Sequence, residues 1–148
     1  MTPADHLQVF TGAKVLYSAC LEPVCRKYGL NRTELDILLF LAGNPQYDTA
    51  ADICAVRSLA KSHVSTSIRS LEGAGFLEKY QLPADRRAVH LRVLPAADAV
   101  TADGRAAQER FRSVLSAGLT PEEQRAFERA SEAIMRNVQT FMEESNLC

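Results

Sequence analysis

The stretch that most restricts what this chain can fold into is residues 61–94, KSHVSTSIRSLEGAGFLEKYQLPADRRAVHLRVL. Its first part has branched apolar residues at helical spacing, which places them on one stripe of a helix: Val64, Ile68 and Leu71. Gly73 and Gly75 follow, and glycine adopts the left-handed conformation of a helix end at little cost. We therefore expect one helix that starts near Lys61 and stops sharply at the two glycines.

A two-stranded ribbon is expected directly after this helix. Apolar and polar residues alternate over 76–81 and again over 89–93, which predicts two half-buried strands. The loop between them, residues 83–87, ends in Arg86 and Arg87. A short helix followed by a ribbon with two arginines at its turn is the outline of a winged helix-turn-helix.

The face of the helix opposite its apolar stripe is short, polar and rich in hydrogen-bonding groups. It comprises Lys61, Ser62, His63, Ser65, Thr66 and Arg69. Between positions 57 and 92 there are seven basic residues against three acidic ones, a balance of +4 in a chain whose net charge is −1. This asymmetry indicates that the segment faces a polyanion. For His63 a solvated helix position is the alternative, and for Ser67 we expect packing against a neighbouring helix.

Three further helices are predicted in and before this module. The first covers about residues 5–28, where Pro23 should cause a kink or a break near Cys20. The second opens with the capping box of Asn31 and Glu34 and is apolar nearly all round, so it should be central to the core. A third, about residues 50–57, is capped by Thr49, with Ile53 and Val56 facing inward. With the helix after it, this helix matches a helix-turn-helix.

Two helices are predicted after the ribbon. One starts at Pro95 and runs to about residue 117, weakened locally by Gly104. The other starts at Thr120, Pro121 and Glu123. Helices at both ends carry apolar stripes without a second core, which we explain by packing against a second copy of the chain. The expected dimer-interface residues are Leu7, Phe10, Phe111, Leu115, Phe127, Ile134, Val138 and Phe141.

Bulk properties narrow the class of protein. The hydrophobic share of 47% is that of an ordinary globular chain, no run is long enough for a membrane span, and the N-terminus does not resemble a secretion signal, so we expect a cytoplasmic protein. The cysteines are expected to stay reduced and to pack as small residues, with redox sensing as the alternative: Cys20, Cys25, Cys54 and Cys148. No nucleophile triad, phosphate-binding glycine loop or metal-ligand spacing is present, so we expect neither an enzyme nor a cofactor or metal site.

Three motifs resemble the MarR family of bacterial transcription regulators: LAKSHVS at 59–65, LEGAGFL at 71–77 and DRRAVHL at 85–91. The resemblance implies a mainly α fold with a small β-hairpin wing, in a single domain over 1–148. Within it, 31–94 would be the winged-helix DNA-binding part, and 1–30 and 95–148 the helical dimerisation part. It further implies a homodimeric repressor or activator on a near-palindromic operator in double-stranded DNA.

The resemblance also implies roles for particular residues. Arg87, with Arg86, would enter the minor groove beside the recognition helix. A small-molecule effector could be held in a pocket with Phe10, Tyr17 and Leu38.

The motifs depart from the common family pattern at three positions. Ala60 stands where a serine or threonine cap is frequent, Thr66 where an arginine is frequent, and Arg69 where an acid is frequent. That acid can pair with the second wing arginine, so here either Asp85 forms the wing salt bridge or Arg69 reaches a phosphate. A winged-helix interaction module that does not bind DNA, and a thiol-based redox regulator, remain as alternative functions.

Overall fold

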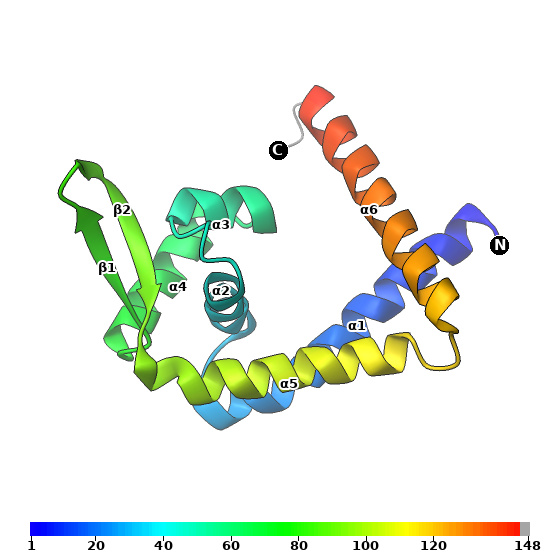
Figure 1. Ribbon diagram of the computed structural model, residues 1–148, viewed down its shortest axis with the longest axis horizontal. Coiled ribbons are helices and arrows are strands. Elements are labelled where there is room, and N and C mark those ends of the chain that lie inside the picture. The colour runs from blue at the N-terminus through cyan, green and yellow to red at the C-terminus, as the bar shows by residue number, and fades with distance from the viewer. Residues whose placement is uncertain (146–148) are drawn as a thin grey trace. The chain divides into compact units, whose positions relative to one another are not determined.

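The computed structural model describes residues 1–145 of the chain. Its elements are α1 (Pro3–Tyr28), α2 (Arg32–Gly43), α3 (Ala50–Arg57), α4 (Lys61–Gly73), β1 (Leu77–Leu82), β2 (Asp85–Val93), the 3-10 turn η1 (Pro95–Ala97), α5 (Asp98–Leu115) and α6 (Pro121–Glu144). Figure 1 shows the hairpin of β1 and β2 beside α4. The expected fold class, mainly helical with a hairpin wing, is confirmed. No helix within residues 1–145 has the length and apolar character required to cross a membrane.

Most helices begin at a capping box. The side chain of the residue before the helix accepts a hydrogen bond from the backbone amide three residues ahead, and the carboxylate of that later residue accepts one from the backbone amide of the first. The pairs are Thr2 with Asp5, Asn31 with Glu34, Thr49 with Asp52, and Thr120 with Glu123. The first pair starts α1 at Pro3, two residues before the predicted start. The start of α4 has no side-chain cap, because Ala60 occupies that position.

Pro23 lies inside α1, which is continuous from Pro3 to Tyr28, so the expected alternative of a break is wrong. A proline removes the amide that would bond to the carbonyl of Ala19. Both residues are exposed, so water can satisfy that carbonyl. Leu21, Val24 and Cys25 on the other side of the helix are buried, and their packing keeps the helix in place.

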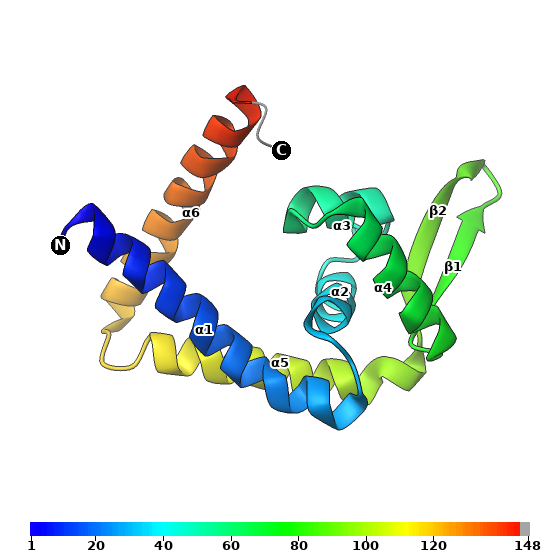
Figure 2. The same cartoon turned by 180° about the vertical axis from the view of Figure 1, so that it is seen from behind.

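The core is centred on α2, as predicted. Leu35, Ile37 and Leu38 are completely inaccessible to solvent. Figure 2 shows α1 and α5 side by side, with α2 next to them, and hydrogen bonds join the two long helices: Lys27 and Tyr28 both donate to Asp103 at 2.7 Å. Gly104 on α5 is buried against Leu39 of α2, and a Cβ there would lie 2.6 Å from Leu39 Cδ2. The glycine therefore serves close packing, which the predicted weakening of the helix did not capture.

The helix-turn-helix of α3 and α4 has no glycine in its turn. Ser58 takes the left-handed conformation instead, with φ of 51°, and caps α3. Ile53 is buried as expected, but Val56 is 48% exposed, so its predicted inward orientation is wrong. At eight residues α3 is barely two turns long, and Ile53 is its one buried residue.

The wing is a tighter hairpin than predicted. Strands β1 and β2 pair antiparallel from Leu77 opposite Val93 to Leu82 opposite Asp85, with an irregularity between Tyr80 and Leu82. The connection is thus only residues 83–84, and β2 begins four residues earlier than its apolar alternation indicated. The first residues of β2 are polar and exposed, so they lack the alternation of apolar and polar residues by which a strand is predicted.

The segment after the wing also differs at its start. Pro95 opens the 3-10 turn η1, and the α-helix begins at Asp98 and ends at Leu115. The described chain divides into two compact units after Phe111. Within the second unit, α6 begins at the predicted box of Thr120 and Glu123, and none of its described residues is buried.

Candidate nucleic-acid interface

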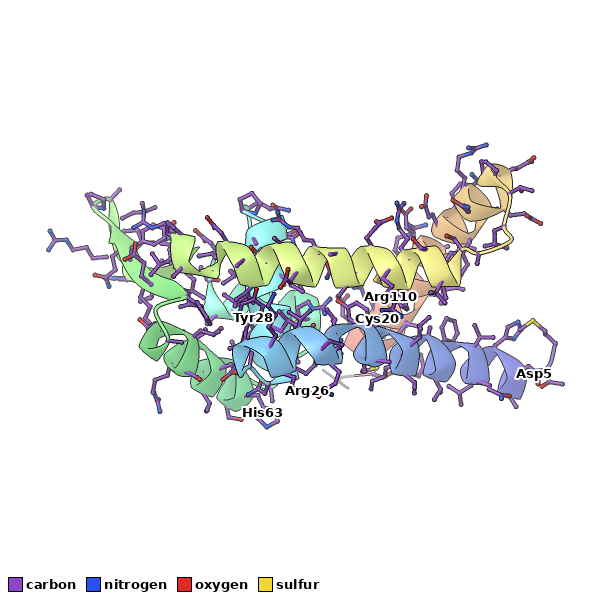
Figure 3. The ribbon with its side chains drawn as sticks, turned by 90° about the horizontal axis from the view of Figure 1, so that it is seen from below. Asp5, Cys20, Arg26, Tyr28, His63 and Arg110 are labelled. Atoms are coloured by element: carbon purple, nitrogen blue, oxygen red, sulfur yellow. The ribbon has the colours of Figure 1, made fainter. Side chains whose placement is uncertain are left out.

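Helix α4 has one buried face and one face open to solvent. Val64, Ser67, Ile68 and Leu71 are buried, which confirms the predicted apolar stripe and the packing role of Ser67. Every residue predicted to touch DNA from this helix is exposed: Lys61, Ser62, His63, Ser65, Thr66 and Arg69. Figure 3 shows His63 directed outward from α4. The two faces separate because apolar side chains recur at the helical period.

The cations around this face differ in whether they are neutralised. Lys79 pairs with Glu72 at 2.9 Å, and Arg92 pairs with Glu78 at 2.7 Å. The other five cations of residues 57–92 have no hydrogen-bond or ion-pair partner for their charged group among residues 1–145: Arg57 at the end of α3, and Lys61, Arg69, Arg86 and Arg87. The local excess of positive charge is therefore concentrated on the outer face of α4 and the start of β2.

Arg86 and Arg87 are the second and third residues of β2, so they belong to the strand and the prediction that they lie in the loop is wrong. The expected wing salt bridge of Asp85 is not formed within the described chain. The Asp85 carboxylate instead accepts from the backbone amide of Arg87 at 3.0 Å. An aspartate commonly accepts a hydrogen bond from the backbone amide two residues later. Asp85 therefore contacts the backbone of Arg87 and not its guanidinium group.

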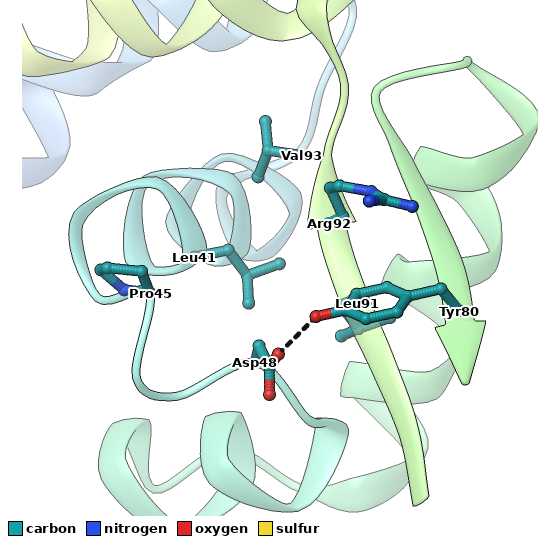
Figure 4. Close-up of a pocket in the computed structure, with 7 residues that line it drawn as sticks. All are labelled: Leu41, Pro45, Asp48, Tyr80, Leu91, Arg92 and Val93. Carbon is teal, nitrogen blue, oxygen red and sulfur yellow. Dashed lines mark hydrogen bonds between the residues drawn. The ribbon is translucent and has the colours of Figure 1, made fainter. Parts of the chain in front are cut away.

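The wing is fastened to the loop between α2 and α3 through Asp48, which sequence reasoning missed. One carboxylate oxygen accepts from Tyr80 of β1 at 2.9 Å, and the other is 2.9 Å from Nδ1 of His90 on β2 (Figure 4 shows the Tyr80 bond). The amide of Leu91 donates to the Asp48 carbonyl at 2.7 Å. The hydrogen bond with His90, followed by that from Tyr80, lowers the pKa of Asp48, so the carboxylate stays ionised. The same contact with Asp48 raises the pKa of Tyr80.

No local pattern could have revealed this contact. Asp48 precedes the cap residue Thr49 and lies 32 and 42 positions from its two partners. Short-range periodicity reports which face of an element is buried, and it says nothing about which distant strand a loop aspartate will meet.

Comparisons with known proteins agree with this geometry. Residues 28–88 match the sequence model of the MarR family. That segment contains α2, α3, α4, β1 and the start of β2, which are the helix-turn-helix and its wing. Over these residues the chain is similar to the MarR family. No curated protein sequence matches it.

Solved MarR-family structures share the fold over most of the chain. A MarR family regulator from Listeria monocytogenes, complexed with a 26mer DNA, superposes with a TM-score of 0.80 at 17% identity over 93% of this chain and 89% of that one. A regulator from Silicibacter pomeroyi gives 0.77 at 19% over 88% and 87%. BpsR from Bordetella bronchiseptica, whose DNA binding is regulated by 6-hydroxynicotinic acid, gives 0.70 at 19% over 88% and 98%. At these identities the likeness shows the fold.

The three residues expected to hold an effector have different surroundings. Leu38 is fully buried in the core, and Phe10 is 54% exposed. The Tyr17 ring is occupied by an edge contact with Phe111, with centroids 5.1 Å apart, and by the Arg32 guanidinium 4.5 Å above it. A pocket of about 230 Å³ lies at the base of the wing, between the loop before α3 and the two strands (Figure 4). Its lining residues are Leu41, Pro45, Asp48, Tyr80, Leu91, Arg92 and Val93.

The structure describes three of the four cysteines. Cys20, Cys25 and Cys54 are free, while Cys148 lies outside the described residues. Burial raises the pKa of Cys25, which disfavours the reactive thiolate. Among residues 1–145 no cluster of side chains has the composition of a metal site.

The residues expected at a dimer interface fall into two groups by exposure. On α1, Leu7 and Phe10 are exposed, and on α6 the four residues of the predicted stripe are between 45% and 61% exposed. Phe111 and Leu115 of α5 are partly buried. Exposed stripes of this size on long helices are unusual for a protein that works as a single copy.

Proposed function

We propose that this chain is a MarR-family transcription regulator that binds double-stranded DNA in a sequence-specific manner. The observation that supports the proposal most strongly is the set of unpaired cations and short polar side chains on one exposed surface, formed by α4 and the start of β2. A surface of this composition matches the phosphate and base-edge chemistry of a duplex.

In this proposal α4 lies in the major groove. Its 13 residues span about 20 Å, and the hydroxyl, imidazole and guanidinium groups of Ser62, His63, Ser65, Thr66 and Arg69 are the kinds that read base edges or hold phosphates. Arg87, with Arg86, enters the adjacent minor groove, where narrow A·T-rich tracts concentrate negative potential. Lys61 contacts a phosphate. Arg69, free of an acidic partner, is available for a phosphate as well.

We further propose that the protein acts as a homodimer. The apolar stripes of α1 and α6 supply the surface, and a second copy is the occupant that fits both, since each stripe is self-complementary in chemistry. Two copies related by a two-fold axis present two α4 helices, so the operator is near-palindromic with half-sites about one helical turn apart.

Repression and effector release complete the proposal. A dimer that covers a full turn of operator blocks access to it, which is the simplest regulatory outcome and one that requires no further surface. DNA binding by BpsR from Bordetella bronchiseptica is regulated by 6-hydroxynicotinic acid, and we propose the same class of control here, with the pocket formed only in the dimer. Binding to chromosomal DNA places the protein in the cytoplasm.

The test is duplex binding as a function of salt. The proposal predicts an affinity that falls linearly on a double-logarithmic plot, because bound phosphates release counterions. The rival function, a winged-helix interaction module, predicts no such binding. A flat salt response, or no binding to any duplex from a random pool, would overturn the proposal in favour of that module.

A further inference from the structure

The wing is held by two sets of contacts at different heights. At its base, Lys79 pairs with Glu72 of α4, and the amide of Leu94 donates to the carbonyl of Phe76. Farther out, Asp48 joins Tyr80 and His90, one strand to each carboxylate oxygen. The outer contact thus ties both strands to the helix-turn-helix at one point.

Beyond that point the hairpin of the described chain forms its side-chain hydrogen bonds only within itself. Within the described chain, the side-chain hydrogen bonds of residues 81–89 are internal to the wing: Gln81 donates to the Arg86 carbonyl, and Asp85 accepts from the Arg87 amide. Side chains there are exposed except for Ala88, which is partly buried. Within residues 1–145, Asp48 is therefore the outermost residue outside the wing whose side chain hydrogen-bonds to it, next to the backbone bridge between Thr49 and His90.

We propose that Asp48 is a positioning residue for DNA binding, which directs the wing arginines toward the groove by fixing Tyr80 and His90 together. For its effect on DNA the inference rests on the proposed function. Asp48 itself lies on the loop before α3 and does not belong to the predicted DNA-contacting face.

The orientation of the hairpin at the Asp48 contact determines the position of Arg87. From His90 to Arg87 is three residues, or about 10 Å along an extended strand. A small rotation of the hairpin at His90 therefore moves the guanidinium of Arg87 by a distance comparable with the tolerance of a hydrogen bond. Ring contacts also hold Tyr80 and His90 together, since Tyr80 stacks on His90 at 5.3 Å and Arg92 lies 4.7 Å above Tyr80.

The chain offers a matched control at Asp103 of α5. Its carboxylate also accepts from a tyrosine hydroxyl and from a cationic side chain, Tyr28 and Lys27, each at 2.7 Å. Asp103→Ala thus removes an equivalent pair of hydrogen bonds at the junction of α1 and α5, where no residue of the wing takes part in them. Tyr80→Phe is the milder companion variant, since it removes one hydroxyl and keeps the ring.

The first measurement needs no DNA. Backbone 15N order parameters of residues 83–88 are recorded in the full chain for the wild type, Asp48→Ala, Tyr80→Phe and Asp103→Ala. We expect values to fall from about 0.8 to below about 0.6 in Asp48→Ala, to fall less in Tyr80→Phe, and to stay unchanged in Asp103→Ala. Unchanged values in both wing variants would overturn the inference whether or not the protein binds DNA. Should Asp48→Ala fail to fold, Tyr80→Phe decides.

The second measurement is a double-mutant cycle with Arg87→Ala on a selected duplex. We expect Asp48→Ala to weaken binding about 10-fold in the wild-type background and less than about 2-fold when Arg87 is already absent, since coupled residues give non-additive losses. Asp103→Ala should combine additively with Arg87→Ala. Multiplicative losses for Asp48 and Arg87 would contradict the positioning role while leaving the DNA-binding function intact. A wild type without duplex affinity would instead refute the proposed function, and the order parameters would still decide the role of Asp48.

Discussion

Gly104 of α5 and Leu39 of α2 are packed so closely that a Cβ on the glycine would lie 2.6 Å from Leu39 Cδ2. Real side chains do not approach to that distance, so substitution forces Leu39 or one of the helices to move. Leu39 is only 7% exposed and has little room for another rotamer.

Gly104→Ala is therefore expected to destabilise the protein, although alanine favours helix by about 1 kcal/mol over glycine. We predict a net loss of about 1–2 kcal/mol, measured by chemical denaturation. Gly12→Ala in α1 is the control, because nothing lies within 4 Å of a Cβ there, and it should gain up to about 1 kcal/mol. Equal effects of the two substitutions would refute the packing explanation.

The apolar stripe of α6 gives a prediction for assembly. Ile134 lies on that stripe and is exposed in the single copy, while Arg136 lies about 180° around the same helix from Phe127. Ile134→Glu places a charge in the proposed interface and should convert the dimer largely to monomer at micromolar concentration, as measured by light scattering after size exclusion. Arg136→Glu should leave the dimer intact. A dimer unaffected by Ile134→Glu would place the interface elsewhere.

The free guanidinium of Arg87 gives a prediction for salt dependence. Arg87→Ala should weaken duplex binding about 10-fold and reduce the slope of affinity against salt by about 2 for a dimer, one per copy. Arg26→Ala removes the same charge from an exposed position on α1, where the arginine lies 3.6 Å from Glu22, and should leave the slope unchanged. Fluorescence anisotropy at several salt concentrations measures both. An unchanged slope for Arg87→Ala would remove the wing from the interface.

The junction of α1 and α5 gives a prediction for pH. The hydrogen bond from Lys27, followed by that from Tyr28, lowers the pKa of Asp103 below its usual value of 3.8. A lowered carboxyl pKa stabilises the fold above the unfolded value, and that contribution is lost as the pH falls through the folded value. The same hydrogen bond raises the pKa of Lys27. Its contribution to the stability of the fold is therefore present below about pH 10.5 and is lost as the pH rises through the folded pKa. NMR titration should show Asp103 returning toward 3.8 in Lys27→Met, and no such return would contradict this assignment.

Much of this fold follows from local rules that the sequence displays directly. Capping boxes placed the starts of α2, α3 and α6, and the helical spacing of Val64, Ile68 and Leu71 separated the two faces of α4. The exposed polar face was therefore predictable residue by residue. The apolar stripes and the charge balance already indicated a second copy and a polyanion, and the resemblance to the MarR family added the near-palindromic operator in double-stranded DNA.

The features that were missed depend on contacts between distant segments. Gly104 reads as a weak point in a helix until Leu39, 65 positions earlier, is known to lie against it. Asp48 reads as an ordinary loop residue until the wing folds onto it. The early start of β2 was missed for another reason: Arg86 and Arg87 are exposed strand residues, and without alternating burial they look like loop.

The most direct test of the account is selection of duplexes from a random pool by the purified wild-type protein. A dimer with two α4 helices should enrich an inverted repeat whose half-sites are centred about one helical turn apart, with an A·T-rich step where each wing would lie. A pool that stays unenriched, or one that yields a single unrepeated site, would contradict the proposal that the two α4 helices of a dimer bind two half-sites of one duplex.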